Sequence, residues 1–518
     1  MVLEVKKRGT NMTADIRRIN SDAGTLSIAQ SICPLCHKPI EAFYVEEKGR
    51  VYFVKECDEH GTFRTMASEN AENFKEWIKH PVVNIPPRKP ITAGAVIRDG
   101  DAKGSECPLH CGTCENHLQT ACCVLIDITD RCNQHCPYCF AKSEQDDDRS
   151  CEPTLEQIGK KYDLLLELGE ERPFNIQLSG GEPTVRNDLP QIIRMAKDKG
   201  FEYVQINTNG RRLATEEGYA QILKDAGATV IFMQFDGTRD DIYEKLRGEP
   251  LLEIKKQAIR NCEKAGLGVT LVPTIVQGVN TDNIGDMMDF LAENVNVVKG
   301  IHFQPVSFFG RHPEKITQTG QNHELPEPVL HSGDFPGRIT MFGLLEELQR
   351  QRPEFSIDDM CPIATGHTLC CFYSTYIREP DGSVKCTLSA KKKSEGVSCC
   401  ETVSCCETET ADCCCTQQAD DIDELSIIRK DRDYVLDKWE ITESVDERGA
   451  CMYSSSDEIM DLDEFLKYCR RNTFTVTGMA FQDVMNLDSE RLKRCRVQVL
   501  SDDNRLIPFC AYNSIYRV

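Results

Sequence analysis

The stretch "CVLIDITDRCNQHCPYCF" (residues 123–140) joins an apolar segment to a loop that contains three closely spaced cysteines. The first part is rich in Val, Leu and Ile, which predicts a buried strand. The loop then sets Cys132, Cys136 and Cys139 in a C-x3-C-x2-C pattern. A zinc site or a fully ligated iron–sulfur cluster takes four protein ligands. Three thiols therefore indicate a cluster whose remaining iron is open to another molecule.

The residues after this loop continue as alternating strand-like and helix-like segments. Six βα-type units follow one another up to residue 345. Apolar strands separated by helices predict an α/β fold whose parallel sheet curls into a partial (β/α)6 TIM-like barrel. Chemistry in such barrels lies at the C-terminal ends of the strands. Those ends carry "SGGEP" (179–183), "NTNG" (207–210) and "FDG" (235–237), in addition to the cysteine loop.

The cysteine loop and the "SGGEP" strand end together resemble the radical S-adenosylmethionine (SAM) superfamily. The resemblance implies a catalytic [4Fe–4S] cluster on Cys132, Cys136 and Cys139, whose open iron binds SAM. One-electron reduction then yields a 5′-deoxyadenosyl radical. It also implies a SAM site formed by Tyr138, Gly180, Gly181, Glu182, Asn207, Thr208, Asn209 and Asp236. Glycines permit close approach of a backbone, so the glycine pair is expected to contact the methionine amino group.

Two further groups of metal-ligand residues precede the barrel. Cys33, Cys36, Cys57 and His60 have the spacing of a mononuclear zinc or iron site at the ends of a β-hairpin. The second group comprises Cys107, Cys111, Cys114 and Cys122. Four thiols complete the coordination of a metal centre, which predicts a closed auxiliary [4Fe–4S] cluster or, as the alternative, a structural zinc.

More cysteines follow the barrel. A second auxiliary cluster is predicted on Cys361, Cys370, Cys386 and Cys510, with Cys371 and Cys495 as alternative ligands and ordinary buried thiols as the competing interpretation. The segment 399–415 contains seven cysteines and few apolar side chains, so we expect it to be disordered or ordered by metal.

These patterns divide the chain into six predicted regions. They are a metal-binding knuckle with its linker (1–90), an auxiliary cluster segment (91–123), the barrel (124–345), a cysteine-containing extension (346–392), the cysteine-rich insert (393–422) and a C-terminal domain (423–518). Within the last region, residues 494–513 are expected to form a β-hairpin.

Longer stretches resemble the archaeal tetraether lipid synthases and their dihydropterin-methylating relatives. They include "CPLHCGTCENHLQTAC" (107–122), residues 271–311 and "RLIPFCAYN" (505–513). The resemblance implies several [4Fe–4S] clusters, a mononuclear metal, and carbon–carbon bond formation between lipid chains begun by hydrogen abstraction. The alternatives are a methyltransferase acting on a pterin-like molecule and a peptide-modifying radical enzyme. A non-catalytic electron carrier is disfavoured, because electron transfer does not need a vacant iron.

The composition limits the surroundings and partners of the protein. The net charge of −22 argues against a nucleic-acid-binding groove. The sequence contains no run of 18 apolar residues, and residues 1–20 do not form a signal peptide, so neither a transmembrane segment nor secretion is expected. Cysteines in tight groups indicate metal ligation in a reducing cytoplasm. The expected partners are a small-molecule or lipid substrate, a low-potential donor such as ferredoxin or flavodoxin, and peripheral contact with a membrane.

Overall fold

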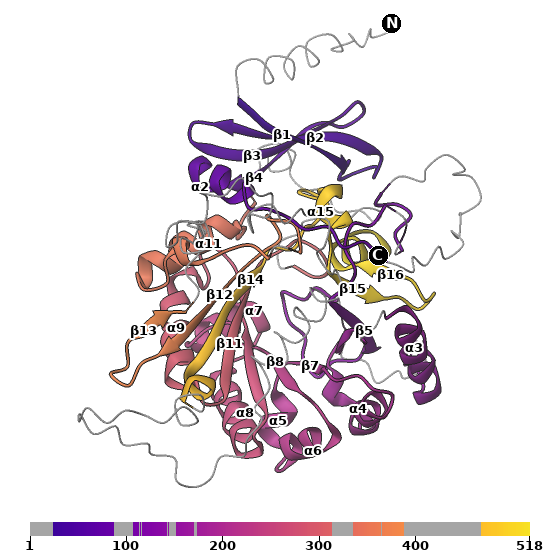
Figure 1. The fold of residues 1–518 in the computed structure, drawn as a ribbon, viewed down its shortest axis with the longest axis vertical. Helices are drawn as coiled ribbons and strands as arrows, with labels where there is room; N and C mark the ends of the chain where they lie inside the picture. The colour runs from indigo at the N-terminus through magenta and orange to yellow at the C-terminus, as the bar shows by residue number, and fades with distance from the viewer. Residues whose placement is uncertain are drawn as a thin grey trace, which may run out of the picture.

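The computed structural model describes residues 24–87, 107–112, 114, 116–141, 143, 152–169, 173–312, 335–363, 365–387 and 468–517. The predicted insert at 393–422 lies outside the described residues, as does most of the linker before Cys107. Two sheets organise the described part: a small N-terminal sheet and a large sheet that carries the barrel (Figure 1).

The N-terminal sheet is an antiparallel ribbon of four strands in sequence order. The strands are β1 (Gly24–Ile32), β2 (Pro39–Glu47), β3 (Arg50–Cys57) and β4 (Gly61–Ser68), and helix α2 (Ala71–Ile78) follows. The predicted hairpin is confirmed, because β2 pairs with β3 from Ala42 to Glu47. Lys48 and Gly49 connect them with positive φ angles of 53° and 77°, as a tight hairpin turn requires.

The six predicted barrel strands form a continuous parallel series. They are β5 (Cys123–Thr129), β6 (Asn175–Gly180), β7 (Val204–Thr208), β8 (Val230–Gln234), β9 (Gly268–Val272) and β11 (Val298–Pro305), with the short β10 (Thr274–Ile275) beside β11. Their side chains are almost all buried, for example in Val124, Ile176 and Ile231. Strands buried on both faces explain the continuous apolar runs in the sequence.

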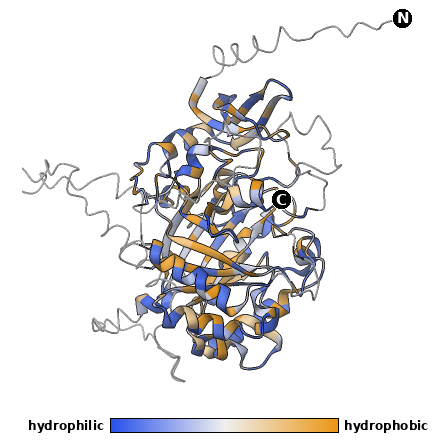
Figure 2. Cartoon of the chain, turned by 90° about the vertical axis from the view of Figure 1, so that its right-hand side faces the viewer, coloured by the Kyte–Doolittle hydropathy of each residue, from blue (hydrophilic) through white to orange (hydrophobic). Residues whose placement is uncertain are grey.

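Helices cover the outer face of this series (Figure 1). They are α3 (Leu155–Leu168), α4 (Leu189–Asp198), α5 (Arg211–Thr215), α6 (Tyr219–Ala226), α7 (Asp240–Arg247), α8 (Leu252–Ala265), α9 (Ile284–Glu293) and α11 (Met341–Gln351). Figure 2 shows hydrophobic residues along the central strands and mixed colours on the surrounding helices. No helix within the described ranges combines the length and apolar character needed to cross a bilayer.

The C-terminal tail extends the barrel sheet at both edges, which the sequence did not indicate. β14 (Thr473–Met479) pairs parallel with β11, and β15 (Val497–Leu500) pairs parallel with β5. The tail therefore lengthens the parallel series at its first and last strands. β12 (Cys371–Arg378) and β13 (Val384–Cys386) continue beyond β14, and β16 (Leu506–Pro508) pairs with β15 in the expected hairpin.

The ribbon is fastened to the tail by hydrogen bonds between them. Ser31 Oγ donates to the Leu487 carbonyl at 2.5 Å, and Tyr44 donates to Asp488 at 3.0 Å. These tail residues lie between β14 and helix α15 (Ser489–Lys493). The ribbon thus lies over the region where β14 ends, above the main sheet (Figure 1).

Candidate active site

The three-cysteine loop leaves the C-terminal end of β5 and is held from the far side of the barrel by Arg311. The Cys139 and Arg311 backbones exchange two hydrogen bonds, of 3.0 and 2.7 Å. The Arg311 guanidinium also donates to the carbonyls of Cys136 and Ser143. Gly310 has a φ of +80°, and a Cβ there would lie 2.2 Å from the Cys139 carbonyl oxygen. Only glycine allows this approach, so residues at the end of β11 help to shape the cluster loop.

Arg247 holds the loop from a second direction. It donates to the Tyr138 carbonyl at 2.8 Å, and it forms a two-point ion pair with Asp236 at 2.7 and 2.8 Å. Asp236 is fully buried and also accepts from the Thr274 amide. Its carboxylate is therefore engaged by protein groups, and it positions Arg247. Arg247 could not be singled out from the sequence, because an arginine in the last turn of a helix is favoured by the helix dipole alone.

The two glycines of "SGGEP" bring β6 against the cluster loop. A Cβ on Gly180 would lie 2.1 Å from the Thr129 carbonyl oxygen, and one on Gly181 would lie 2.3 Å from that of Arg131. The Gly181 amide donates to Thr129 and the Glu182 amide donates to Arg131. The glycine pair thus allows the ends of β5 and β6 to approach closely.

Glu182 connects the ends of β6 and β7. Its buried carboxylate accepts from Thr208 Oγ1 at 2.7 Å and from the Asn209 amide at 2.6 Å. Asn209 Nδ2 in turn donates to Asn133 of the cluster loop at 2.7 Å. Asn207 donates to Gln177 at 3.3 Å. The structure therefore brings the predicted SAM-site residues of three successive strand ends to one face of the loop.

Lys255 is a buried cation at this face that sequence reasoning missed. Its Nζ donates to the Asn209 carbonyl at 2.5 Å and to Gln234 at 2.9 Å. Burial lowers the pKa of Lys255 to about 8, although the charge of Asp236 acts in the opposite direction. Its position on the buried face of α8 could have been suspected from the helical periodicity, which places Lys255 in register with Ala258, Ile259 and Cys262.

The three loop thiols have the chemistry of cluster ligands. Burial, with contributions from the Glu182 carboxylate and the thiols of Cys136 and Cys139, raises the pKa of Cys132 to about 12. Burial likewise raises the pKa of Cys136, although Arg247 acts against this. Neighbouring buried thiols of this kind become thiolates only beside a strong positive charge, which iron ions supply. The residues therefore fit a [4Fe–4S] cluster held by three cysteines.

Comparison with known proteins agrees with this geometry. Residues 126–291 match the radical SAM superfamily, and residues 25–69 match a zinc ribbon domain described as HMPTM N-terminal. A 7,8-dihydro-6-hydroxymethylpterin dimethyltransferase of Methanocaldococcus jannaschii is 33% identical over 94% of this chain and 93% of its own length. The chain belongs to the radical SAM superfamily. It is therefore a radical SAM enzyme, and the family implies a [4Fe–4S] cluster and SAM as cofactors.

Other relatives of this radical SAM enzyme share a shorter region. A probable GTP 3′,8-cyclase of Methanococcus aeolicus is 33% identical over 35% of this chain and 59% of its own length. Among solved structures, SuiB of Streptococcus suis bound to SAM aligns with 15% identity and a TM-score of 0.32, covering 40% of this chain and 45% of that chain. A methylornithine synthase aligns with 16% identity and a TM-score of 0.31, covering 40% and 59%.

The predicted N-terminal metal ligands converge in the ribbon. The ligand atoms of Cys33, Cys36, Cys57 and His60 all lie within 4.8 Å of one another. The Cys36 and Cys57 sulfurs are 3.9 Å apart, and His60 Nδ1 is 3.6 Å from the Cys33 sulfur and 3.5 Å from that of Cys57. These separations suit a tetrahedral ion with metal–sulfur bonds of about 2.3 Å.

Several of the remaining described cysteines lie in two groups. Cys107, Cys111 and Cys114 lie together, since the Cys107 thiol and burial raise the pKa of Cys111 and Cys114 adds to the effect. Cys122 directly precedes β5, and its amide donates to the carbonyl of Arg496, which follows Cys495.

A second trio consists of Cys370, Cys495 and Cys510. Burial raises the pKa of Cys510 to about 12, and Cys370 contributes to this. Burial raises the pKa of Cys495, with both other thiols adding to the effect. Two predicted ligands have other contacts along β12: Cys361 with the Tyr373 carbonyl at 3.7 Å and Cys386 with Ser374 Oγ at 3.4 Å. Cys495, weighed as an alternative ligand, takes their place beside Cys370 and Cys510.

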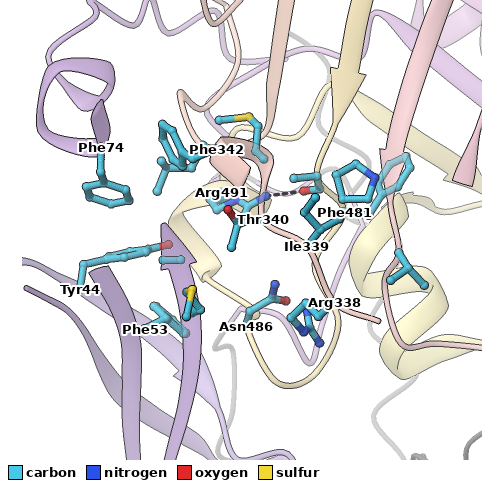
Figure 3. Close-up of a pocket in the computed structure, with 17 residues that line it drawn as sticks. Tyr44, Phe53, Phe74, Arg338, Ile339, Thr340, Phe342, Phe481, Asn486 and Arg491 are labelled. Carbon is cyan, nitrogen blue, oxygen red and sulfur yellow. Dashed lines mark hydrogen bonds between the residues drawn. The ribbon is translucent and has the colours of Figure 1, made fainter. Parts of the chain in front are cut away.

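A cavity lies where β11 and β14 end and the ribbon covers them (Figure 3). It has a volume of about 60 Å³, and its walls come from the ribbon, α2, the start of α11 and the tail. Aromatic rings form much of the lining, namely Tyr44, Phe53, Phe74, Phe342 and Phe481, and the polar lining residues are Arg338, Thr340, Asn486 and Arg491. The carboxyl ends of parallel strands are the usual place for a substrate in such folds.

A row of rings connects this cavity to the cluster loop. The Arg338 guanidinium lies 4.6 Å from the ring centre of Phe308. Phe308 lies 5.2 Å from His312, and His312 meets Tyr138 edge to face at 5.7 Å. Tyr138 precedes the last cluster cysteine. The cavity wall and the cluster loop are therefore in continuous packing contact.

Proposed function

We propose that this radical SAM enzyme methylates a carbon atom of a small pterin-type heterocycle. The observation that carries the proposal is the cavity beside the cluster loop, which is compact, lined by aromatic rings and equipped with polar groups. Flat heterocycles bind between aromatic side chains with a few polar groups fixing their orientation. The full-length similarity to a protein named a hydroxymethylpterin dimethyltransferase supports the same substrate class.

We assign a role in the reaction to each set of residues in the site. When bound, the cluster and SAM supply a 5′-deoxyadenosyl radical, which removes a hydrogen atom from a substrate carbon. Arg247 and Arg311 fix the loop that carries the three thiols. Gly180, Gly181 and Glu182 form the strand ends that we assign to the methionine part of SAM. The aromatic walls exclude water, which protects a carbon radical from side reactions.

The two cysteine trios fit auxiliary iron–sulfur clusters. The trio of Cys370, Cys495 and Cys510 borders the cavity, because Arg491 lines the cavity and its Nε lies 3.4 Å from the Cys370 sulfur. Cys370, Cys495 and Cys510 would hold such a cluster, which would supply one-electron chemistry beside the cavity. The described cysteines are all free thiols, which suits a reducing cytoplasm and an electron donor of the ferredoxin or flavodoxin type.

Lipid coupling was the first function expected from the sequence resemblance. It requires a differently shaped site. Two long alkyl chains need an extended apolar channel, whereas the described cavity is small and has two arginines in its lining. The cavity therefore supports the heterocycle over the lipid.

The test uses anaerobically reconstituted full-length protein with dithionite and SAM. We expect 7,8-dihydro-6-hydroxymethylpterin to stimulate 5′-deoxyadenosine formation and to gain methyl groups by mass spectrometry. Isotope-labelled SAM then shows whether SAM is the methyl donor. Cys132→Ala should abolish nucleoside formation. Stimulation by an archaeal lipid extract, with none by the pterin, would reject the proposal in favour of lipid coupling.

A further inference from the structure

Some polar atoms of the cavity lining have hydrogen-bond partners, and others have none. Arg338 Nη2 donates to Asp483 at 2.7 Å, and its guanidinium packs on the rings of Phe308 and Phe335. Its Nε is buried and has no hydrogen-bond partner. Only 8% of the Arg338 side chain is exposed. A buried unpaired donor is costly, by about 1–3 kcal/mol, unless a ligand satisfies it.

Two further donors in the lining are open. Asn486 Oδ1 accepts from the Asp483 amide at 2.9 Å, and this leaves Nδ2 without a partner among the described residues. Arg491 uses Nε for the Cys370 sulfur and Nη2 for the Ala480 carbonyl. Within the same part of the chain, its Nη1 has no partner and its charge has no carboxylate in ion-pair contact. Figure 3 shows Asn486 and Arg338 side by side, with Arg491 across the cavity from them.

The oxygen-bearing side chains of the lining already take part in hydrogen bonds. Asn486 Oδ1 is taken by the Asp483 amide, and Thr340 Oγ1 accepts from the Gly343 amide and donates to Glu69. The Tyr44 hydroxyl donates to Asp488. The polar side-chain groups of the described lining that make no hydrogen bond are therefore N–H donors. A ligand edge that presents acceptors would complement it, and an edge that presents N–H groups would not.

We propose that Arg338 and Asn486 form a donor edge that binds the acceptor edge of the heterocycle, with Arg491 on the opposite side of the cavity. This inference rests on the proposed function and specifies how the substrate lies. In a 7,8-dihydropterin the 4-oxo oxygen and the neighbouring ring nitrogen N5 both accept hydrogen bonds, whereas N3–H and the 2-amino group donate. The ring thus lies between the aromatic walls with its O4/N5 side toward Arg338 and Asn486, and its 2-amino group points away from them.

The experiment compares two ligands and one donor-to-acceptor exchange. Anaerobic, cluster-loaded full-length protein is titrated calorimetrically with 7,8-dihydro-6-hydroxymethylpterin and with its analogue that carries a 4-amino group in place of the oxygen. Wild type should bind the 4-oxo compound about 10- to 100-fold more tightly, since a buried donor facing a donor loses its hydrogen bond. Asn486→Asp keeps the acceptor used by Asp483 but replaces the open donor, so it should reduce or reverse this preference. Arg338→Lys should weaken binding of the 4-oxo compound.

Arg352→Lys is the matched control, because Arg352 pairs with Asp289 outside the cavity. Arg352→Lys should prefer the 4-oxo compound over the 4-amino compound by the same factor as wild type. Equal binding of both ligands by wild type and Asn486→Asp would overturn the donor edge while leaving the pterin proposal intact, since binding itself would be demonstrated. Absence of pterin binding by a wild-type protein that still cleaves SAM would overturn the proposed substrate class and the donor edge with it.

Discussion

Lys55 in the ribbon donates a hydrogen bond of 2.6 Å to the backbone carbonyl of Val484, in the tail loop that leads to Asn486. The ammonium also donates to the Ile32 carbonyl at 2.9 Å and to Ser31 Oγ at 3.3 Å, and Lys55 is fully buried. One lysine thus joins two ribbon strands to a loop of the cavity wall. The N-terminal ribbon is therefore a part of the cavity wall and of the proposed substrate site.

We expect Lys55→Met to impair substrate binding more than SAM cleavage. The variant leaves buried carbonyl groups unpaired, which should lower the free energy of unfolding by about 1–3 kcal/mol. Pterin affinity, measured by calorimetry, should fall, while basal 5′-deoxyadenosine formation persists. Lys79→Met, at an exposed ion pair with Glu76, is the control. If Lys55→Met binds the pterin as tightly as wild type, the contact between the ribbon and the tail loop does not contribute to substrate binding.

Loss of the ribbon metal should have the same selective effect. His60→Ala removes one of four ligands, so we expect one fewer mononuclear zinc or iron per chain by elemental analysis. Because Tyr44 and Phe53 of the ribbon line the cavity, pterin affinity should decrease while the iron–sulfur absorbance stays near that of wild type. Cys262→Ala, at a buried thiol of α8, serves as the comparison. A metal content unaffected by His60→Ala would exclude the four-ligand site.

Asp236→Asn tests whether this carboxylate acts through Arg247. Removing the charge leaves a buried guanidinium uncompensated, which should destabilise the fold by about 3–5 kcal/mol. Anaerobic guanidinium denaturation should show the loss, accompanied by weaker cluster incorporation at the loop. Asp289→Asn breaks the partly exposed pair with Arg352 and should cost about 0–1 kcal/mol. Similar stabilities of the two variants would argue against the buried pair as an anchor of the loop.

The assignment of the second cysteine trio can be decided by counting iron. Cys370→Ala should lower iron by about four atoms per chain if the trio holds a cubane cluster. Cys361→Ala should leave the iron content unchanged, because this thiol contacts the Tyr373 carbonyl. Electron paramagnetic resonance of the reduced proteins provides a second measure. Loss of iron in Cys361→Ala would instead support Cys361 as a ligand, as in the set predicted from the sequence.

The sequence was most informative where contacts are local. Strand and helix periodicity predicted the six parallel strands, and the strand-end position of the loop followed from it. The ribbon ligands were also predictable, since Cys33 and Cys36, and Cys57 and His60, are near neighbours joined by one hairpin. Short-range spacing determines such sites almost completely.

Long-range contacts were not available from one sequence. Cys370 meets Cys495 and Cys510 only because β12 and β15 occupy opposite edges of a curled sheet, and nothing in their local pattern encodes this. Arg247 was missed for the same reason, because its partner Asp236 precedes it by eleven residues across a strand-to-helix connection. Pairings of this type depend on tertiary packing rather than on propensity or periodicity.

The barrel sheet can be completed only after the strands β14 and β15 have been synthesised. A ribosome completes β5 through β11 long before residues 473–500 emerge, so a nascent barrel exposes the free backbone groups of both its outer strands. Unpaired edges of this kind invite association with other chains. Cysteines for the second trio also arrive last, at 495 and 510, so that trio can be complete only once nearly the whole chain is made. A polypeptide that ends before residue 473 therefore lacks both strands that pair with the outer barrel strands. It also lacks part of the cavity wall and the thiols of Cys495 and Cys510.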